Sequence, residues 1–289
     1  MARATGDGIE IEYETFGEPS DPALLLVSGL SSQLLGWEAE FCELLAAGGR
    51  FVIRYDNRDV GLSTHFDGQI VDLANLQQSR RDPGQASKVP YTLSDMAADG
   101  MLVLDDLGIE RAHIAGMSMG GMIVQTMAIE HPDRVLTLTS IMSTTGEADY
   151  FKSSDEASQV LFAPPPSERE AYIESSVTSA VFCSKRYFDP ERAKQRAAEA
   201  FDRMFYPEGV GRQIAAIWAS GDRADGLRAL DVPTLVIHGA DDTLIMPPGG
   251  LRTAELVPHA DLLLLGDMGH DLPAPMWPRI VSAILAHTG

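Results

Sequence analysis

A Gly-Met-Ser-Met-Gly pentapeptide centred on Ser118 constrains the fold of this chain more than any other feature. It follows the apolar run 112–115, typical of a buried strand, and precedes residues 121–128, whose composition indicates a helix. A serine in this setting is typical of a nucleophile elbow. Small neighbours are required because a Cβ at Gly116 or Gly120 would collide with the crossing strand and helix. The alternative interpretation is an ordinary strand-to-helix turn, in which glycines are common for steric reasons.

Strands and helices alternate along most of the chain. Patterns typical of strands occupy residues 9–16, 23–27, 51–55, 112–115, 135–142, 233–237 and 261–265. Helical patterns occupy residues 37–47, 93–107, 121–128, 251–257 and 277–287. This alternation predicts an α/β fold with a mainly parallel central sheet and helices on both faces.

The alternation stops between residues 145 and 228, a span rich in aromatic residues. We predict that residues 1–144 and 229–289 form the core domain and that residues 145–228 form a helical cap inserted over it. Most of the aromatic side chains are expected to pack the helices of the cap together, and a few to face an apolar pocket. Residues 65–90 are interpreted as an irregular loop.

A serine hydroxyl becomes an effective nucleophile when a base takes its proton and an acid orients that base. In a parallel sheet such groups lie on loops at the carboxyl ends of strands. Of the seven histidines, His270 is the one that follows the last expected strand at that end. The acid is expected after strand 233–237, where Asp241 and Asp242 are adjacent; we favour Asp242, and Asp241 stays open. His238 directly precedes them and is interpreted as supporting the turn.

Acyl transfer also needs hydrogen-bond donors for the negative oxygen of the tetrahedral intermediate. The residue after the nucleophile, Met119, offers its backbone N–H at the positive end of a helix. The second donor is expected in the loop after strand 23–27, where Gly29 permits a backbone turn. We favour the N–H of Leu30, with Ser31 as the alternative. An ordinary glycine loop is the other interpretation.

These residues resemble the α/β-hydrolase superfamily, in which the triad follows the chain order Ser, Asp, His. More narrowly, the chain is similar to bacterial serine esterases of the aclacinomycin methylesterase type. The likeness runs from about residue 8 to residue 287 and rests on Ser28–Leu30 with Trp37, on residues 55–63, on the elbow, on the turn at Asp242 and on residues 269–273. The resemblance implies an α/β-hydrolase fold, a triad of Ser118, Asp242 and His270, and no metal or organic cofactor.

The chain departs from this pattern in three places. Many relatives have His-Gly where this chain has Ser28 and Gly29. Pro247 lies one position later than is usual after the acid, which keeps Asp241 open as the acid. The cap is the least similar part, and it is the part that would select the substrate.

The charge and composition of the chain limit the kinds of molecule that it is expected to bind. The formal net charge of −20 disfavours nucleic acids and anionic lipid surfaces, and favours a neutral or cationic small molecule. The N-terminus shows no apolar export segment, and no run is long enough to span a bilayer. Cys42 and Cys183 lack the spacing of a metal site. We therefore expect a cytoplasmic protein with two reduced thiols and no metal.

The expected function is that of a serine hydrolase that cleaves a carboxylic ester with an apolar portion through an acyl-enzyme intermediate. Lactonase, carbon–carbon bond hydrolase and perhydrolase activities use the same triad and stay open. So does a non-enzymatic ligand-binding protein that retains the scaffold.

Overall fold

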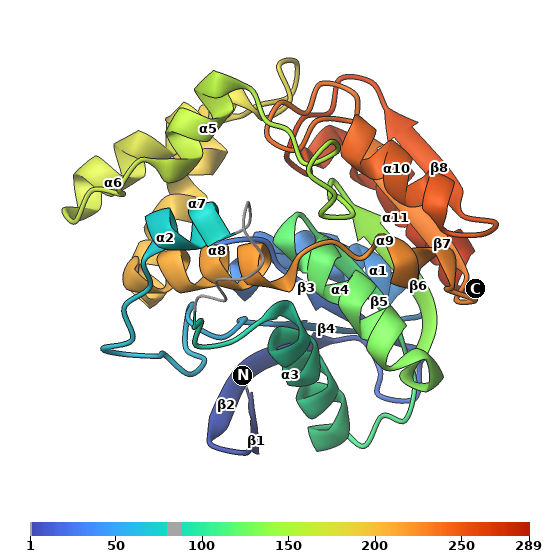
Figure 1. The fold of residues 1–289 in the computed structure, drawn as a ribbon. Coiled ribbons are helices and arrows are strands. Elements are labelled where there is room, and N and C mark those ends of the chain that lie inside the picture. The colour runs from blue at the N-terminus through green and yellow to red at the C-terminus, as the bar shows by residue number, and fades with distance from the viewer. Residues whose placement is uncertain (1, 80–87) are drawn as a thin grey trace.

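Residues 2–79 and 88–289 are described by the structure, a computed structural model. Within them, a central sheet of eight strands has the order β1-β2-β4-β3-β5-β6-β7-β8 (Figure 1). The strands are β1 (Ala2–Gly6), β2 (Ile9–Phe16), β3 (Ala23–Val27), β4 (Phe51–Tyr55), β5 (Ala112–Met117), β6 (Val135–Ile141), β7 (Thr234–Gly239) and β8 (Asp261–Leu265). β2 pairs antiparallel with β1 and β4, and all other neighbours are parallel. The carboxyl ends of β3 to β8 therefore lie along one edge of the sheet.

Helices surround this sheet and extend beyond it. They are α1 (Ala39–Ala47), α2 (Leu73–Ser79), α3 (Leu93–Asp106), α4 (Met119–Glu130), α5 (Asp155–Phe162), α6 (Arg169–Ser175), α7 (Pro190–Arg203), α8 (Glu208–Ser220), α9 (Ala224–Arg228), α10 (Pro248–Leu256) and α11 (Trp277–Thr288). Figure 1 shows α5, α6 and α7 gathered on the side of the molecule away from β1 and the N-terminus.

The sheet is buried on both faces, which explains its nearly continuous apolar sequences. Because successive side chains of a strand point to opposite faces, alternate residues of β3 join different cores. Leu25 and Val27 pack with residues of α3 and α4 on one face. Leu24 and Leu26 pack with residues of α1 and α11 on the other. This packing on both faces of the sheet fixes the register of the central strands, and so it fixes the positions of the loops that follow them.

The expected α/β architecture with a mainly parallel sheet is confirmed, and each of the expected strands and helices is present. The interpretation of residues 65–90 as an irregular loop is wrong in part, because Leu73–Ser79 form α2. This helix is short and buries Leu76, so its sequence offers too few turns to show a helical period. Residues 80–87 of the expected loop lie outside the described residues. β1 was not expected, because Ala4 alone of its residues is buried; pairing with β2 supports it instead. The division into a core and a cap at residues 145–228 stays a prediction.

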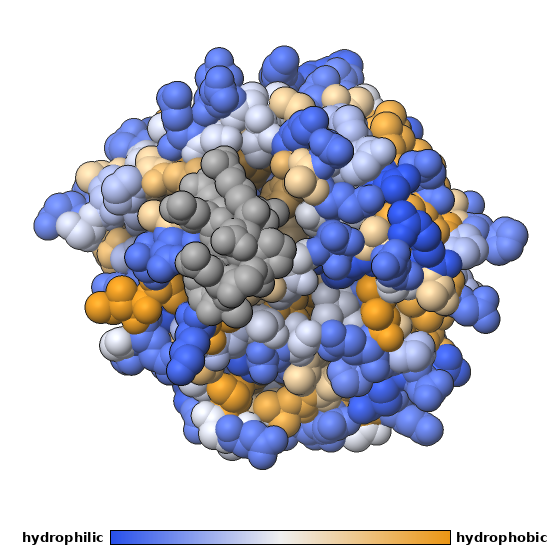
Figure 2. All heavy atoms as spheres, viewed as in Figure 1, coloured by the Kyte–Doolittle hydropathy of each residue, from blue (hydrophilic) through white to orange (hydrophobic). Residues whose placement is uncertain are grey.

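Hydrophilic side chains cover most of the face seen in Figure 2, and smaller apolar areas lie between them. Within the described residues, no helix combines the length and the apolar character that crossing a membrane requires.

Candidate active site

Ser118 lies at the tip of the turn between β5 and α4. Its backbone dihedral angles, φ 56° and ψ −120°, are ones that residues other than glycine rarely adopt. The turn is possible because its neighbours lack a Cβ. On Gly116 a Cβ would lie 2.1 Å from the carbonyl oxygen of Gly120, and on Gly120 it would lie 2.1 Å from that of Val27. Helix α4 thus begins directly against the ends of β5 and β3.

His270 lies on the loop that follows β8, beside the serine. Its Nε2 is 2.9 Å from Ser118 Oγ, and its Nδ1 is 2.7 Å from Oδ2 of Asp242. A carboxylate only accepts hydrogen bonds, so the proton is assigned to Nδ1, which leaves Nε2 to accept the serine hydroxyl. The main-chain N–H of His270 donates to the carbonyl oxygen of Phe182 at 2.7 Å, which fixes the loop itself.

Asp242 lies in the turn after β7 and is 2% exposed. Its Oδ1 accepts the N–H groups of Leu244 and Ile245 at 2.8 and 2.9 Å, so Oδ2 is left to face His270. The neighbouring residue Asp241 is half-buried, and its main-chain N–H donates a hydrogen bond to the carbonyl oxygen of Met268 at 3.0 Å. The structure therefore brings Asp242, rather than Asp241, to the imidazole.

Two imidazoles influence the charge of Asp242. Burial raises the pKa of this carboxyl, but the nearby His270 and His238 side chains oppose that effect and hold the pKa below its usual value. His238 is fully buried, with Nε2 2.8 Å from the carbonyl oxygen of Ile245 and 3.5 Å from Asp242 Oδ2. A carboxylate that is ionised at neutral pH can orient a neutral imidazole and stabilise the imidazolium that forms when it takes a proton.

Two backbone N–H groups near Ser118 can donate hydrogen bonds to a negatively charged oxygen. A Cβ on Gly29 would lie 3.2 Å from Ser118 Cβ, so the loop after β3 lies against Ser118. Among the described residues, the N–H of Leu30 has no hydrogen-bond partner. Met119 is the first residue of α4, where N–H groups have no partner within the helix. The N–H of Ser31 is engaged, because it donates to Oε1 of Gln213 at 2.9 Å.

No cluster of three or more His, Cys, Asp or Glu side chains able to hold a metal ion occurs in the described part of the chain. The candidate site consists of a serine, an imidazole, a carboxylate and backbone donors.

Comparison with known proteins decides the family. A family model described as the alpha/beta hydrolase fold matches residues 22–273. The chain belongs to the α/β hydrolase fold family. The resemblance expected from the sequence is thereby confirmed.

Relatives of this hydrolase carry several activities in their names. It is 28% identical over 318 residues to rhodomycin D methylesterase DnrP of Streptomyces peucetius, which covers 98% of this chain and 96% of that protein. It is 24% identical to 3-oxoadipate enol-lactonase 2 of Acinetobacter baylyi, over 90% of this chain and 86% of that protein. The expected likeness to bacterial methylesterases is confirmed.

Solved structures agree on the fold. The enol-lactonase from Burkholderia xenovorans LB400 has a TM-score of 0.74 at 22% identity, and the match covers 99% of both chains. A meta-cleavage product hydrolase from Pseudomonas fluorescens IP01 has a TM-score of 0.76 at 19% identity, over 99% of this chain and 97% of that chain. At these identities the likeness concerns the fold alone.

Three side chains around the site of the hydrolase were not expected from its sequence. Ser143 Oγ donates to the carbonyl oxygen of Ser118 at 2.8 Å and so braces the elbow. Phe182 lies edge-on to the His270 ring, with the centroids 6.2 Å apart. Gln213 reaches Ser31 from α8. None belongs to a local motif, so no signal in the sequence marked them.

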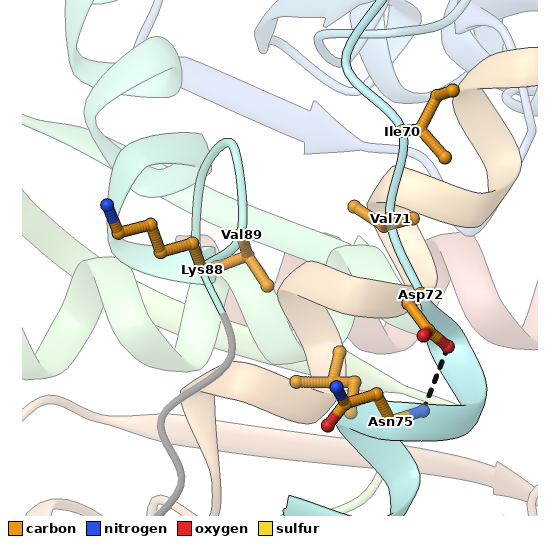
Figure 3. A pocket seen from close by; sticks show the side chains of 7 residues that line it. Ile70, Val71, Asp72, Asn75, Lys88 and Val89 are labelled. Atoms are coloured by element: carbon orange, nitrogen blue, oxygen red, sulfur yellow. Dashed lines mark hydrogen bonds between the residues drawn. The ribbon is translucent and has the colours of Figure 1, made fainter.

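A separate pocket of about 240 Å³ lies at the amino end of α2 (Figure 3). It is lined by Ile70, Val71, Asp72, Asn75, Leu76, Lys88 and Val89. Figure 3 shows Asp72 capping the helix through the N–H of Asn75, while the Lys88 side chain points away from the other lining residues. The pocket contains none of the Ser118, Asp242 and His270 side chains.

Proposed function

We propose that this protein hydrolyses a carboxylic ester with Ser118, His270 and Asp242 as its catalytic triad. Ser118 Oγ attacks the ester carbonyl while His270 Nε2 takes the hydroxyl proton, and the N–H groups of Leu30 and Met119 bind the resulting oxyanion. His270 then protonates the departing alcohol, which leaves an acyl group on Ser118. Water, deprotonated by His270, attacks that acyl group, and His270 returns the proton to Ser118 Oγ as the carboxylic acid leaves.

The observation that carries the proposal is the continuous chain of contacts from Ser118 Oγ to His270 at 2.9 Å and from His270 to Asp242 at 2.7 Å. The names of the methylesterase relatives support an ester as the substrate. Lactone hydrolysis is the second candidate, because a lactone is a cyclic ester and an enol-lactonase is among the relatives.

We also propose that residues 145–228 act as a cap that supplies the apolar part of the substrate site. Phe182 lies beside His270, where an apolar acyl or alcohol group would need a neighbour. Aromatic side chains also gather between α6 and α7, where Tyr172, Phe201 and Phe205 pack against one another. An apolar ester portion fits these surroundings better than a charged one.

Hydrolysis of p-nitrophenyl esters of graded chain length, beside lactones and methyl esters, tests the proposal. Ser118→Ala is expected to lose at least about 10⁴-fold in kcat, because removal of the nucleophile leaves only binding and oxyanion effects. Asp242→Asn is expected to lose about 10³- to 10⁴-fold, with Asp241→Asn as the matched control that keeps activity. A fluorophosphonate should label the wild-type protein at Ser118. Absence of labelling on the folded protein would favour a ligand-binding role instead.

A further inference from the structure

The backbone turn that presents Leu30 is strained. Residues 29–32 form a four-residue turn in which the N–H of Ser32 donates to the carbonyl oxygen of Gly29 at 3.2 Å. Ser31 is the third residue of the turn and has a φ of 57°. Glycine is preferred at this position of a type II turn, because other residues are strained at positive φ. A type I turn could join Gly29 and Ser32 equally well. In it the peptide between the two central residues is reversed and neither of them has a positive φ. A serine at position 31 therefore needs a contact from outside the turn to favour the type II form.

Gln213, on α8, supplies that contact. Its side chain is fully buried, its Oε1 accepts the N–H of Ser31 at 2.9 Å, and its Nε2 donates to the carbonyl oxygen of Arg58 at 2.8 Å. The N–H of Ser31 belongs to the central peptide of the turn, the unit that reverses between the two turn types. Because the oxygen and the nitrogen of the Gln213 amide each have a partner, the amide is held in one orientation. In that orientation its oxygen faces Ser31 and can accept only from an N–H there.

A second contact joins the same loop to the neighbouring helix. Nε2 of Gln33 donates to the carbonyl oxygens of Ala200 and Met204, at 2.7 and 2.8 Å, where α7 ends. The loop after β3 is therefore held by α7 and by α8, both of which belong to the predicted cap.

We propose that Gln213 is a positioning residue that keeps Ser31 in its left-handed conformation and thereby keeps the N–H of Leu30 directed at the oxyanion. The inference rests on the proposed function, in which Leu30 is an oxyanion donor. When Ser31 relaxes, the peptide between Leu30 and Ser31 reverses, and the N–H of Leu30, which lies on the preceding peptide, is displaced relative to Ser118 as the loop adjusts to that reversal. Because the oxyanion exists only after attack on the carbonyl, this displacement lowers kcat and leaves KM nearly unchanged.

The first test compares two changes on α8. Gln213→Met keeps the length of the side chain and removes both hydrogen bonds. We expect kcat to fall about tenfold or more, yet by less than the roughly 100- to 1000-fold cost of removing a donor outright. Ser220→Ala is the matched control: Ser220 Oγ accepts the N–H of Leu93 at 2.9 Å, so the change removes a contact of α8 with α3 and none with the loop after β3. Its kcat should equal that of the wild type.

The second test combines Gln213→Met with Ser31→Gly. Glycine adopts positive φ without strain, so the turn no longer depends on Gln213. We expect Gln213→Met to lower kcat by less than about twofold in the Ser31→Gly background. An equal loss in both backgrounds, or a loss carried by KM, would overturn the proposal, because a contact that only packs the cap onto the core gives independent effects.

Controls separate folding and the proposed function from this inference. Thermal unfolding is measured for every variant, and Gln213→Ala, which leaves room for water at both partners, replaces Gln213→Met where that variant does not fold. If neither Gln213→Met nor Gln213→Ala folds, and adding Ser31→Gly does not restore folding, the result also counts against the proposal. If Ser118→Ala keeps activity, the proposed function fails. If Ser118→Ala is inactive while Gln213→Met behaves like Ser220→Ala, only the role of Gln213 is wrong.

Discussion

The proposed nucleophile, Ser118, is held in a backbone conformation that serine does not favour. Ser118 has a φ of 56° and a ψ of −120°, and its backbone is kept there by contacts on both sides. Its N–H donates to the carbonyl oxygen of Ile141 at 2.9 Å, and its carbonyl oxygen accepts the hydroxyl of Ser143 at 2.8 Å. Such a conformation costs about 1–3 kcal/mol, which the surrounding sheet and helix offset. The proposed reactivity of Ser118 thus has a cost in stability.

Ser118→Gly should be more stable than Ser118→Ala by about 1 kcal/mol, because glycine adopts this conformation without strain although it loses more chain entropy on folding. Both variants lack the hydroxyl, so their difference reports the backbone alone. Urea unfolding at neutral pH measures it. Equal free energies of unfolding would show that the elbow stores no strain.

Buried His113 makes stability depend on pH. It lies in β5, is 7% exposed and has Nδ1 2.9 Å from Thr137 Oγ1. Burial, assisted by the positive charges of Arg50 and His287, lowers the pKa of His113 to about 4 from an ordinary value of 6.5. The unfolded chain therefore binds a proton at a pH where the folded chain does not. The contribution of His113 is fully present above pH 6.5 and is lost as the pH falls toward 4.

His113→Asn should weaken this dependence. The amide still offers Thr137 a hydrogen-bond partner but does not titrate. Between pH 7 and pH 4, the free energy of unfolding of the wild type should fall by about 3 kcal/mol more than that of the variant, since each pKa unit is worth about 1.4 kcal/mol. Urea unfolding at both pH values tests this. Parallel losses in the two proteins would contradict the assigned pKa.

At the scale of elements, the position of α4 depends on the absence of side chains where it meets β5 and β3. Gly120→Ala should reduce the free energy of unfolding by about 3 kcal/mol or more, because the new Cβ would lie 2.1 Å from the carbonyl oxygen of Val27, which cannot move aside. Gly211→Ala in α8 is the control, since its Cβ would meet only Val71 Cγ2 at 3.7 Å. That change should stabilise the protein by about 0.5–1 kcal/mol. Similar effects of the two changes would refute the packing argument.

The sequence predicts elements well where one physical rule governs them. Strands buried on both faces show continuous apolar runs, and the carboxyl ends of parallel strands meet at one edge, so the positions of Ser118 and His270 follow from local patterns. Asp241 and Asp242 share one turn, and only the fold shows which of them faces the imidazole. The contact between Ser31 and Gln213 joins residues 182 positions apart, so no local pattern indicates it.

At the scale of the whole molecule, buried ion pairs join the predicted cap to the core. Arg212 on α8 binds both carboxylate oxygens of Asp59, at 2.8 and 2.9 Å, and neither side chain is more than 6% exposed. Arg203, at the end of α7, lies 2.7 Å from Asp56. Both aspartates belong to the loop after β4. Since a buried charge is costly without its partner, these pairs fix where the helices attach.

Arg212→Met should therefore cost about 3–5 kcal/mol, because it leaves the Asp59 carboxylate buried with Tyr91 as its remaining side-chain donor in the described chain. Adding Asp59→Asn to Arg212→Met removes that buried charge. The double variant should therefore recover at least about 2 kcal/mol of the lost free energy of unfolding.

An exposed pair within the predicted cap gives the matched comparison for this prediction. Arg169 also binds both oxygens of an aspartate, Asp202, at 2.6 Å, but these side chains are 40% and 55% exposed. Arg169→Met should cost less than about 1 kcal/mol, because solvent screens an exposed pair and replaces its hydrogen bonds. Urea unfolding of the three variants measures both effects. If Arg169→Met and Arg212→Met lower the free energy of unfolding equally, burial does not decide how much an ion pair contributes. The attachment of α8 to the core would then have to rest on its apolar contacts and on Gln213.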